Sequence, residues 1–365
     1  MTRKRIGLYL LLLLALAAPA GLPFSEAAAA KVRRDFVGIT SEDAFAGGHG
    51  YRARQLRRQS RLGIGLIRQT FHWRRIETSP GVYRFGRYDK YVLAAARRRI
   101  RILPVLFEAP RFYTSSSGRA ACPPGNPGVM GNFARALIRR YGPAGSLWRS
   151  HPRSRKLPIR SWQVWNEPSL GLYWCGKANA VAYAAMLKRV GAAIKAADPG
   201  AEVVTAGLPP SKLRSAVPLR RYIGQLYSAG AAASFDTLAI NSYSRNAGEL
   251  RRLLRSIRRL MNRRGDRGAR IWVTEIGWGD KGPRSRFIVG RRGQARRISS
   301  SLAYLRRARG SLRLRGFVYF SWRDGRPYAP RFKDLWGLHT GLLTRGGRKK
   351  AAYRAFRVAV RRIRR

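Results

Sequence analysis

The sequence predicts an α/β fold, and most simply a single (β/α)8 barrel, also called a TIM barrel. Eight short apolar runs alternate with amphipathic helical segments along residues 31–365, and no interior linker or repeat divides this stretch. The runs are mostly continuous rather than alternating, as expected of parallel strands that are buried on both faces. Eight β/α units in about 335 residues fit such a barrel with modest loop insertions.

The expected strands recur along the whole of this stretch. They are residues 36–39, 64–67, 102–107, 159–165, 203–205, 237–240, 271–274 and 317–320. Apolar residues at 3–4 spacing predict helices within 129–141, 183–194, 250–261 and 353–363. A doubly wound open sheet is the alternative fold. It usually has fewer strands and a glycine-rich phosphate turn, and the only candidate for that turn, Gly63-Ile-Gly65, lacks the third glycine.

Residues 1–30 have the pattern of a secretory signal peptide. The basic residues Arg3, Lys4 and Arg5 precede a Leu-rich segment, 6–18, and the small residues 27–30 follow. The apolar segment is too short to span a bilayer core of about 30 Å as a helix. We therefore expect the barrel domain, 31–365, to be secreted and to be extracellular or associated with the cell wall. An uncleaved membrane anchor is the alternative.

The chain has two cysteines, Cys122 and Cys175, and four histidines. Because an exported protein meets an oxidising environment, we expect these cysteines to form a disulfide. Two unrelated free thiols are the alternative. Two cysteines with so few histidines argue against a structural zinc site, and we expect neither a metal nor a cofactor.

The chain is strongly basic, with 75 Lys and Arg against 17 Asp and Glu and a formal net charge of +58. An apolar fraction of 45% and an aromatic fraction of 11% exclude wholesale disorder. The charge alone suggests a polyanion, but export argues against nucleic acid as the partner. Arginines such as 251, 252, 255, 258 and 259 predict solvated outer helix faces. Attraction to an anionic wall or exopolysaccharide and a bias in composition both remain open.

Two of the scarce carboxylates end expected strands. Glu167 ends the fourth run and Glu275 ends the seventh. In a (β/α)8 barrel both would project from the carboxyl-terminal mouth, across the barrel from each other. Two facing carboxylates suit glycoside hydrolysis, which needs one protonated donor and one ionised nucleophile. The alternative is that each glutamate caps a helix or pairs with an arginine.

These residues carry a family resemblance. The segments Trp165-Asn-Glu-Pro168 and Thr274-Glu-Ile-Gly-Trp278 resemble those of the clan A glycoside hydrolases, and more specifically the family 39 and family 5 type of secreted bacterial enzymes. Residues 67–73 and 235–243 also fit this pattern. The resemblance implies that Glu167 is the acid/base and Glu275 the nucleophile, with retention of anomeric configuration.

The resemblance also implies roles for the residues around the two glutamates. Asn166 would hydrogen-bond the sugar 2-hydroxyl, Arg68 would orient the nucleophile, and Tyr243 would hydrogen-bond Glu275. Trp322 would form the apolar floor under the sugar ring. One departure stands out, because relatives often place a histidine where this chain has Asn241, two residues before Tyr243.

Other residues near strand ends are weaker candidates for sugar binding. Glu108 and Asp324 could bind sugar hydroxyls or simply pair with arginines. Trp278, Trp73 and Trp174 could stack on sugar faces or pack in the core, and His72 is a structural or substrate hydrogen-bonding residue rather than a base. The chain has no Gly-x-Ser-x-Gly elbow, no His-Glu-x-x-His motif and no phosphate-binding loop.

The sequence thus predicts a monomeric, retaining glycosidase that acts on an oligo- or polysaccharide without a cofactor. The family expectation is a β-glycosidic bond. A non-catalytic carbohydrate- or wall-binding protein on the same scaffold is one alternative. A transglycosidase that uses the same two glutamates is another.

Overall fold

The computed structural model describes residues 32–114, 121–327 and 334–365. The predicted signal peptide, residues 1–30, lies outside the described residues. No helix in the described part of the chain is long and apolar enough to cross a membrane.

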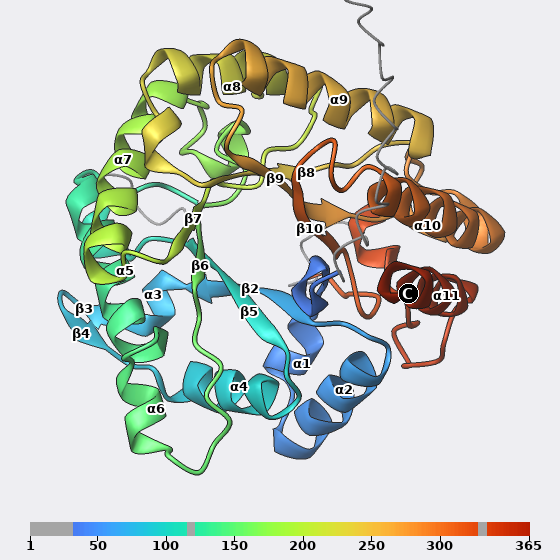
Figure 1. Cartoon of the computed structure of the whole chain (residues 1–365), viewed down its shortest axis with the longest axis horizontal. Coiled ribbons are helices and arrows are strands. Elements are labelled where there is room, and N and C mark those ends of the chain that lie inside the picture. Colours follow the sequence, from blue (N-terminus) through green and yellow to red (C-terminus); the bar gives the residue numbers. More distant parts are fainter. Residues whose placement is uncertain (1–31, 115–120, 328–333) are drawn as a thin grey trace, which may run out of the picture. The chain divides into compact units, whose positions relative to one another are not determined.

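Eight parallel strands close into a barrel, which confirms the predicted fold class (Figure 1). Around the barrel they follow the order β1-β10-β9-β8-β7-β6-β5-β2. Each strand overlaps one of the eight apolar runs. The bounds are β1 Val37–Thr40, β2 Leu66–His72, β5 Arg101–Phe107, β6 Ser161–Val164, β7 Glu202–Val204, β8 Thr237–Asn241, β9 Arg270–Ile276 and β10 Leu314–Tyr319.

Helices surround the barrel (Figure 1). The longer ones are α2 His49–Arg61, α4 Gly86–Arg97, α5 Pro127–Tyr141, α7 Ala180–Ala197, α8 Leu219–Ser228, α9 Ala247–Arg263, α10 Gly290–Arg307 and α11 Ala351–Arg364. Short helices are α1 Glu42–Ala46, α3 Trp73–Ile76 and α6 Ser146–Ser150, with a 3-10 turn η5 at Trp336–His339. The hairpin of β3 Glu77–Ser79 and β4 Val82–Tyr83 was not predicted, because strands this short show no periodicity.

Asparagine caps fix the starts of three helices. The side chains of Asn126, Asn179 and Asn246 accept hydrogen bonds from backbone N–H groups in the first turns of α5, α7 and α9. Such a cap stabilises a helix by about 1 kcal/mol relative to alanine. Each cap sets the residue at which a helix begins. It thereby sets the length of the preceding loop, which leaves a strand at the barrel mouth.

The amino-terminal end of the barrel is filled by packed side chains. A buried cluster that includes Leu66, Leu103 and Trp272 fills the interior. Arg315 lies 4.6 Å from the Trp272 ring and forms ion pairs of 3.0 Å with both Asp35 and Glu202. Because this end is occupied, ligands can approach the barrel interior only from the carboxyl ends of the strands.

One predicted surface arginine is buried. Arg258 on α9 is only 6% exposed, whereas Arg251, Arg252, Arg255 and Arg259 are exposed as expected. A guanidinium nitrogen of Arg258 donates to the backbone oxygens of residues 269 and 312, at 2.8 and 3.2 Å. The prediction for Arg258 is wrong because this position borders the apolar stripe, where a long side chain reaches loop carbonyls under the helix.

Candidate active site

One guanidinium connects three strands at the barrel mouth. Arg68 on β2 is 6% exposed, and its Nη1 donates to Glu275 Oε1 on β9 at 2.6 Å. Its Nη2 donates to Asn166 Oδ1 at 2.8 Å, just after β6. Its Nε donates to Gln163 Oε1 at 2.7 Å. Because every nitrogen of the fork has a partner, the plane of the guanidinium is fixed beside Glu275.

Gln163 supports this arrangement from within β6. It is fully buried, and its Nε2 donates to the backbone oxygen of Thr205 at 3.0 Å. Its Oε1 is therefore oriented toward Arg68. Sequence reasoning missed Gln163, although a polar residue in an otherwise apolar buried strand is a signal that could have found it.

Both carboxyl oxygens of Glu275 accept hydrogen bonds. Oε1 accepts from Arg68 and Oε2 accepts from the hydroxyl of Tyr243, which follows β8. Burial, and then the negative charge of Glu275, raise the pKa of Tyr243 well above its usual value. The tyrosine hydroxyl therefore stays protonated and donates a hydrogen bond to Glu275. The structure thus contains the Arg68 and Tyr243 contacts that the resemblance implied.

Glu167 has a different environment. The side-chain amide of Asn241 donates to Glu167 Oε1 at 2.6 Å. Burial, and then the negative charge of Glu275, raise the pKa of Glu167 to about 8, although Asn241 and Arg68 act in the opposite direction. A carboxyl group with this pKa holds its proton at neutral pH while remaining partly exposed.

Asn241 is itself held in one orientation. Its Oδ1 accepts from the hydroxyl of Thr274 at 2.9 Å, so its amide nitrogen points at Glu167. Gly207 leaves room for it, because a Cβ there would lie 2.2 Å from Asn241 Oδ1. The residue that departs from the family pattern is therefore in direct contact with a candidate catalytic carboxyl.

Glu108 contacts a histidine and an arginine. Its Oε2 lies 2.8 Å from His72 Nδ1 and 2.9 Å from Arg74 Nε. Burial would raise the pKa of Glu108, but these two partners outweigh burial and lower it to about 2. The structure thus gives Glu108 the arginine partner that was the alternative to sugar binding, together with a histidine. Nearby, Glu42 on α1 accepts a hydrogen bond from the Gln69 side chain at 3.0 Å. Sequence reasoning did not single out Glu42, because a helix as short as α1 shows no periodic pattern.

Trp322 does not lie under the candidate site. It is fully buried, and its indole N–H donates to Gln55 on α2 at 3.0 Å. Its ring lies 6.0 Å from that of Tyr353 on α11. The side chain thus faces the helix layer, and the expectation of a floor under the sugar ring is corrected.

The other predicted tryptophans also pack in the core. Trp278 is fully buried, and its indole N–H donates to the backbone oxygen of Ser244 at 2.7 Å. Trp73 stacks on Phe133 with ring centres 5.1 Å apart, and Trp174 is 6% exposed. None of the three presents an open ring face to a sugar, because a large apolar ring gains more from burial in the helix layer.

A different aromatic cluster adjoins Glu275. The rings of Trp336 and Phe287 lie 4.9 and 6.0 Å from that of Tyr243, and Phe320 lies 6.4 Å away. Trp336, Phe287 and Phe320 are all partly exposed. Sequence reasoning missed Trp336, because it lies in an irregular segment after the last strand. Through Tyr243, which contacts Glu275, this cluster lies next to the candidate nucleophile.

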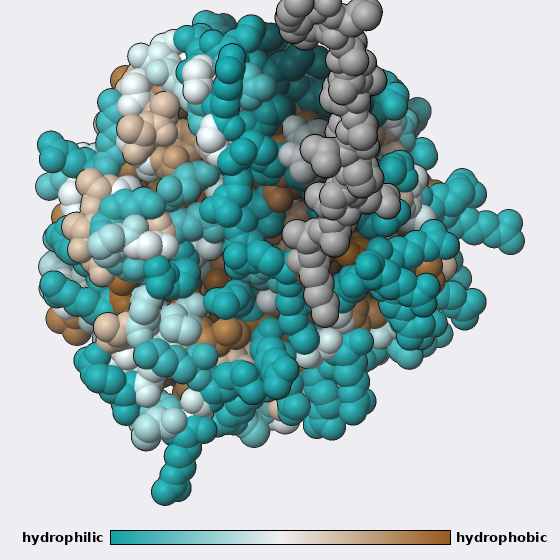
Figure 2. Space-filling model, in the orientation of Figure 1, coloured by the Kyte–Doolittle hydropathy of each residue, from teal (hydrophilic) through white to brown (hydrophobic). Residues whose placement is uncertain are grey.

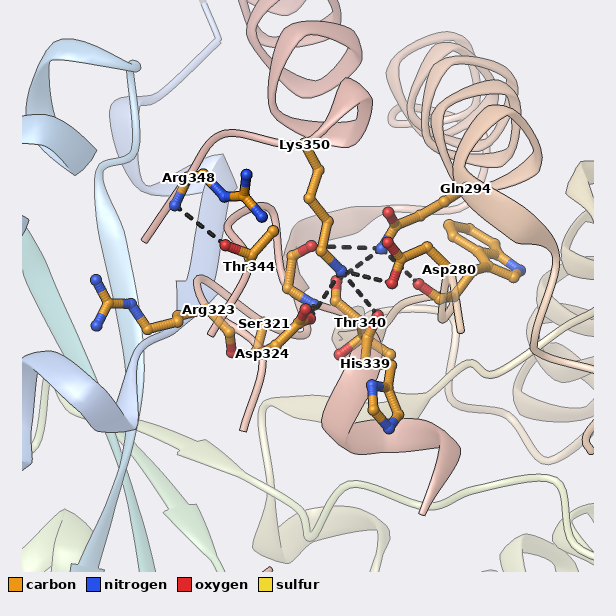
Figure 3. Close-up of polar contacts among 12 residues, drawn as sticks. Asp280, Gln294, Ser321, Arg323, Asp324, His339, Thr340, Thr344, Arg348 and Lys350 are labelled. Atoms are coloured by element: carbon orange, nitrogen blue, oxygen red, sulfur yellow. Dashed lines mark hydrogen bonds and ion pairs between the residues drawn. The ribbon is translucent and has the colours of Figure 1, made fainter. Parts of the chain in front are cut away.

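Buried ionic contacts hold the segment that follows Trp336 (Figure 3). Lys350 Nζ lies 2.7 Å from Asp280, 2.8 Å from Asp324 and 3.2 Å from the backbone oxygen of His339. The Gln294 amide donates to the backbone oxygen of residue 340 at 3.1 Å. Asp324 therefore forms an ion pair with a buried lysine. It neither pairs with an arginine nor faces open solvent.

The predicted disulfide is present. Cys122 and Cys175 are bonded, with Cα atoms 4.6 Å apart and a sequence separation of 53. The bond joins the loop after β5 to the loop after β6, which also carries Glu167. Two walls of the barrel mouth are thereby linked covalently.

Comparisons with known proteins place this architecture. No family model and no curated protein matches the sequence. In structure, the chain is similar to a family 39 glycoside hydrolase from the gut symbiont Bacteroides cellulosilyticus WH2, with 17% identity and a TM-score of 0.66. That match covers 90% of this chain and 64% of the other, so this chain spans less than two thirds of its length.

Two further structures are similar. A family 39 β-xylosidase from Caulobacter crescentus has 21% identity and a TM-score of 0.64, with 90% of this chain and 71% of that chain covered. Xylanase 10B from Thermotoga maritima has 13% identity and a TM-score of 0.58, with 90% and 95% covered. The chain therefore has the barrel fold of family 39 and related glycoside hydrolases, as its sequence resemblance predicted.

Proposed function

We propose that this protein is a secreted, retaining glycoside hydrolase that acts on a carbohydrate through Glu167 and Glu275. The observation that carries the proposal is the contrast between the two carboxyl groups. Glu167 holds a proton because desolvation and the negative charge of Glu275 raise its pKa. Glu275 accepts hydrogen bonds from Arg68 and Tyr243 on its two oxygens. One group is ready to donate a proton and the other to attack.

In the first step, a carboxylate oxygen of Glu275 attacks the anomeric carbon and the bond to the leaving oxygen breaks. Glu167 transfers its proton to that oxygen. In the second step, Glu167 takes a proton from water, whose oxygen attacks the anomeric carbon and releases Glu275. The loss of negative charge from Glu275 in the intermediate lowers the pKa of Glu167, so that it can act as a base.

The neighbours of these carboxyl groups position the reactants. Arg68 and Tyr243 hold Glu275 in one orientation, which reduces the reorganisation needed for attack. Because Asn166 Oδ1 accepts from Arg68, its amide group is oriented to donate to the sugar 2-hydroxyl. Trp336 offers an aromatic face to the apolar side of a sugar ring.

Secretion is part of this proposal. The amino-terminal residues have a signal-peptide pattern, and the disulfide between Cys122 and Cys175 suits an oxidising compartment. Mass spectrometry of the exported protein would locate its amino terminus. Recovery of the reduced protein from the cytoplasm alone would contradict secretion.

The experiment is a screen of purified protein against aryl β-glycosides and polysaccharides, with Glu167→Ala and Glu275→Ala as controls. Both variants should lose activity by orders of magnitude on a substrate with a poor leaving group. With a dinitrophenyl leaving group, which needs no protonation, Glu167→Ala should still form the glycosyl-enzyme and Glu275→Ala should not. Wild-type turnover in either variant would refute the proposal. Binding of a polysaccharide without release of reducing ends would favour a non-catalytic role.

A further inference from the structure

The two helices that close the chain form an outer face with arginines and no acids. α10 and α11 pack against each other and carry eleven arginines and no Asp or Glu. These are residues 291, 292, 296, 297, 306 and 307 on α10 and 354, 357, 361, 362 and 364 on α11. Among the residues that the structure describes, no carboxylate forms an ion pair with any of them. Arg364 donates to the backbone oxygens of residues 34 and 63. The exposed arginines, which include Arg354, Arg357 and Arg362, are available to a partner.

A groove runs between these helices. A hollow of about 760 Å³ is lined by Ala295 and Ser299 from α10 and by Arg354, Arg357 and Val358 from α11. A second hollow of about 130 Å³ shares Ser299, Val358 and Arg362 with the first, so the two hollows adjoin. Val358 is 41% exposed on the floor. Figure 2 shows hydrophilic side chains over α10 and α11, with hydrophobic patches between them.

The groove is elongated along the outer wall. Arg354 and Arg362 are eight residues apart on α11, which corresponds to about 12 Å along a helix axis. Lys349 and Lys350 lie at the end of the groove where α11 begins. In a (β/α)8 barrel, a helix begins near the carboxyl ends of the strands, so the groove leads from the barrel mouth down the outer wall.

We propose that this groove binds a strand of an anionic polysaccharide and holds it next to the barrel mouth. The inference rests on the proposed function, because it makes the bound polymer the source of the substrate. Guanidinium groups suit carboxylate or sulfate groups along such a strand. The floor consists of small apolar side chains, which suit the C–H faces of sugars. A groove for single-stranded nucleic acid would need aromatic platforms for base stacking, and Tyr353 is the one aromatic residue of its lining.

The test is binding of fluorescently labelled polygalacturonate to the purified protein by anisotropy, at 50 and 300 mM NaCl. The groove variant is Arg354→Gln/Arg357→Gln/Arg362→Gln. The matched control is Arg251→Gln/Arg255→Gln/Arg259→Gln, which removes the same charge from α9. The groove variant should bind at least about tenfold more weakly than wild type, and the control should change less than about threefold. Higher salt should weaken wild-type binding.

Three outcomes would overturn the inference. They are no binding of polygalacturonate at 50 mM NaCl, equal weakening in both triple variants, and tighter groove-dependent binding of a single-stranded oligonucleotide than of polygalacturonate. Hydrolysis of a small aryl glycoside should be the same in both variants and in wild type. If the protein hydrolyses no glycoside but the groove variant alone loses polymer binding, the proposed function fails and the groove remains a polysaccharide site.

Discussion

The contact between Asn241 and Glu167 provides a sharp test of how the pKa of the proposed acid, Glu167, is set. The change is Asn241→Ala, which removes the amide that donates to Glu167 Oε1 at 2.6 Å. This hydrogen bond favours the ionised carboxylate and thus lowers the pKa of Glu167. Removing it should therefore raise that pKa above its value of about 8. The alkaline limb of the pH profile of kcat/KM, which reports the loss of the proton from Glu167, should move upward.

The size of the shift follows from the energy of such a bond. A hydrogen bond to a charged group contributes about 1.5–3 kcal/mol, and one pKa unit corresponds to about 1.4 kcal/mol. The upper part of this range gives two units. Water that enters the vacated space will replace part of the interaction, so we expect a shift of about one unit. We also expect kcat to fall by about 10- to 100-fold, because Glu167 loses a contact that orients it.

The assay is kcat/KM against pH from 5 to 10 on an aryl glycoside with a poor leaving group. Asn241→His keeps a donor at this position and should recover most of kcat. Thr274→Val removes the hydroxyl that orients Asn241 and should shift the limb in the same direction by a smaller amount. A downward shift in Asn241→Ala, or an unchanged limb together with normal kcat, would show that Asn241 does not act on Glu167.

The remaining predictions concern stability, the nucleophile, substrate binding and the disulfide. Glu167 binds its proton more tightly when folded, so wild-type stability should fall as pH rises from about 4.5 to about 8. Glu167→Gln should match wild type at pH 4 and be about 2 kcal/mol more stable at pH 9 in urea unfolding, whereas a pH-independent difference would contradict the raised pKa. The lysine in Arg68→Lys cannot reproduce the three hydrogen bonds of the planar guanidinium. This variant should lower kcat by about 10²–10³-fold with an unchanged circular dichroism spectrum. Normal kcat would count against the role of Arg68. Trp336→Ala should raise KM by about tenfold with a smaller effect on kcat, and an unchanged KM would exclude it from the sugar site. Replacing both Cys122 and Cys175 with serine should reduce the free energy of unfolding by about 4 kcal/mol, and no loss would show that the link does not constrain the unfolded chain.

The sequence was sufficient to predict the barrel because its strands are buried on both faces. Continuous apolar runs such as 102–107 and 271–274 are distinctive, and each became part of a strand. The β3–β4 hairpin and the short helices were missed, because segments of two to five residues have no period to detect. Arg258 was predicted wrongly because it borders the apolar stripe of its helix. At such a position the side chain can point to solvent or under the helix, and the sequence pattern does not distinguish the two.

Within the candidate site, residues tied to strand ends were easier to predict than residues whose role depends on side-chain direction. Glu167 and Glu275 follow from strand register, because strand ends meet at the barrel mouth. Trp322 was misplaced because the backbone after β10 turns its ring toward α2. The contact of Asn241 with Glu167 and that of Trp336 with Tyr243 became visible only in the structure, because they join segments far apart in sequence.

Rescue by azide tests the two assigned roles most directly, because azide is a nucleophile that needs no base. With Glu167→Ala and an activated β-glycoside, azide should attack the glycosyl-enzyme and give the β-glycosyl azide, with retained configuration. With Glu275→Ala, azide should take the place of the carboxylate and give the α-glycosyl azide, with inverted configuration. NMR of the two products reads the anomer. The opposite pairing of product and variant, or no rescue of either variant of an active enzyme, would contradict a double displacement in which Glu275 attacks and Glu167 moves the proton.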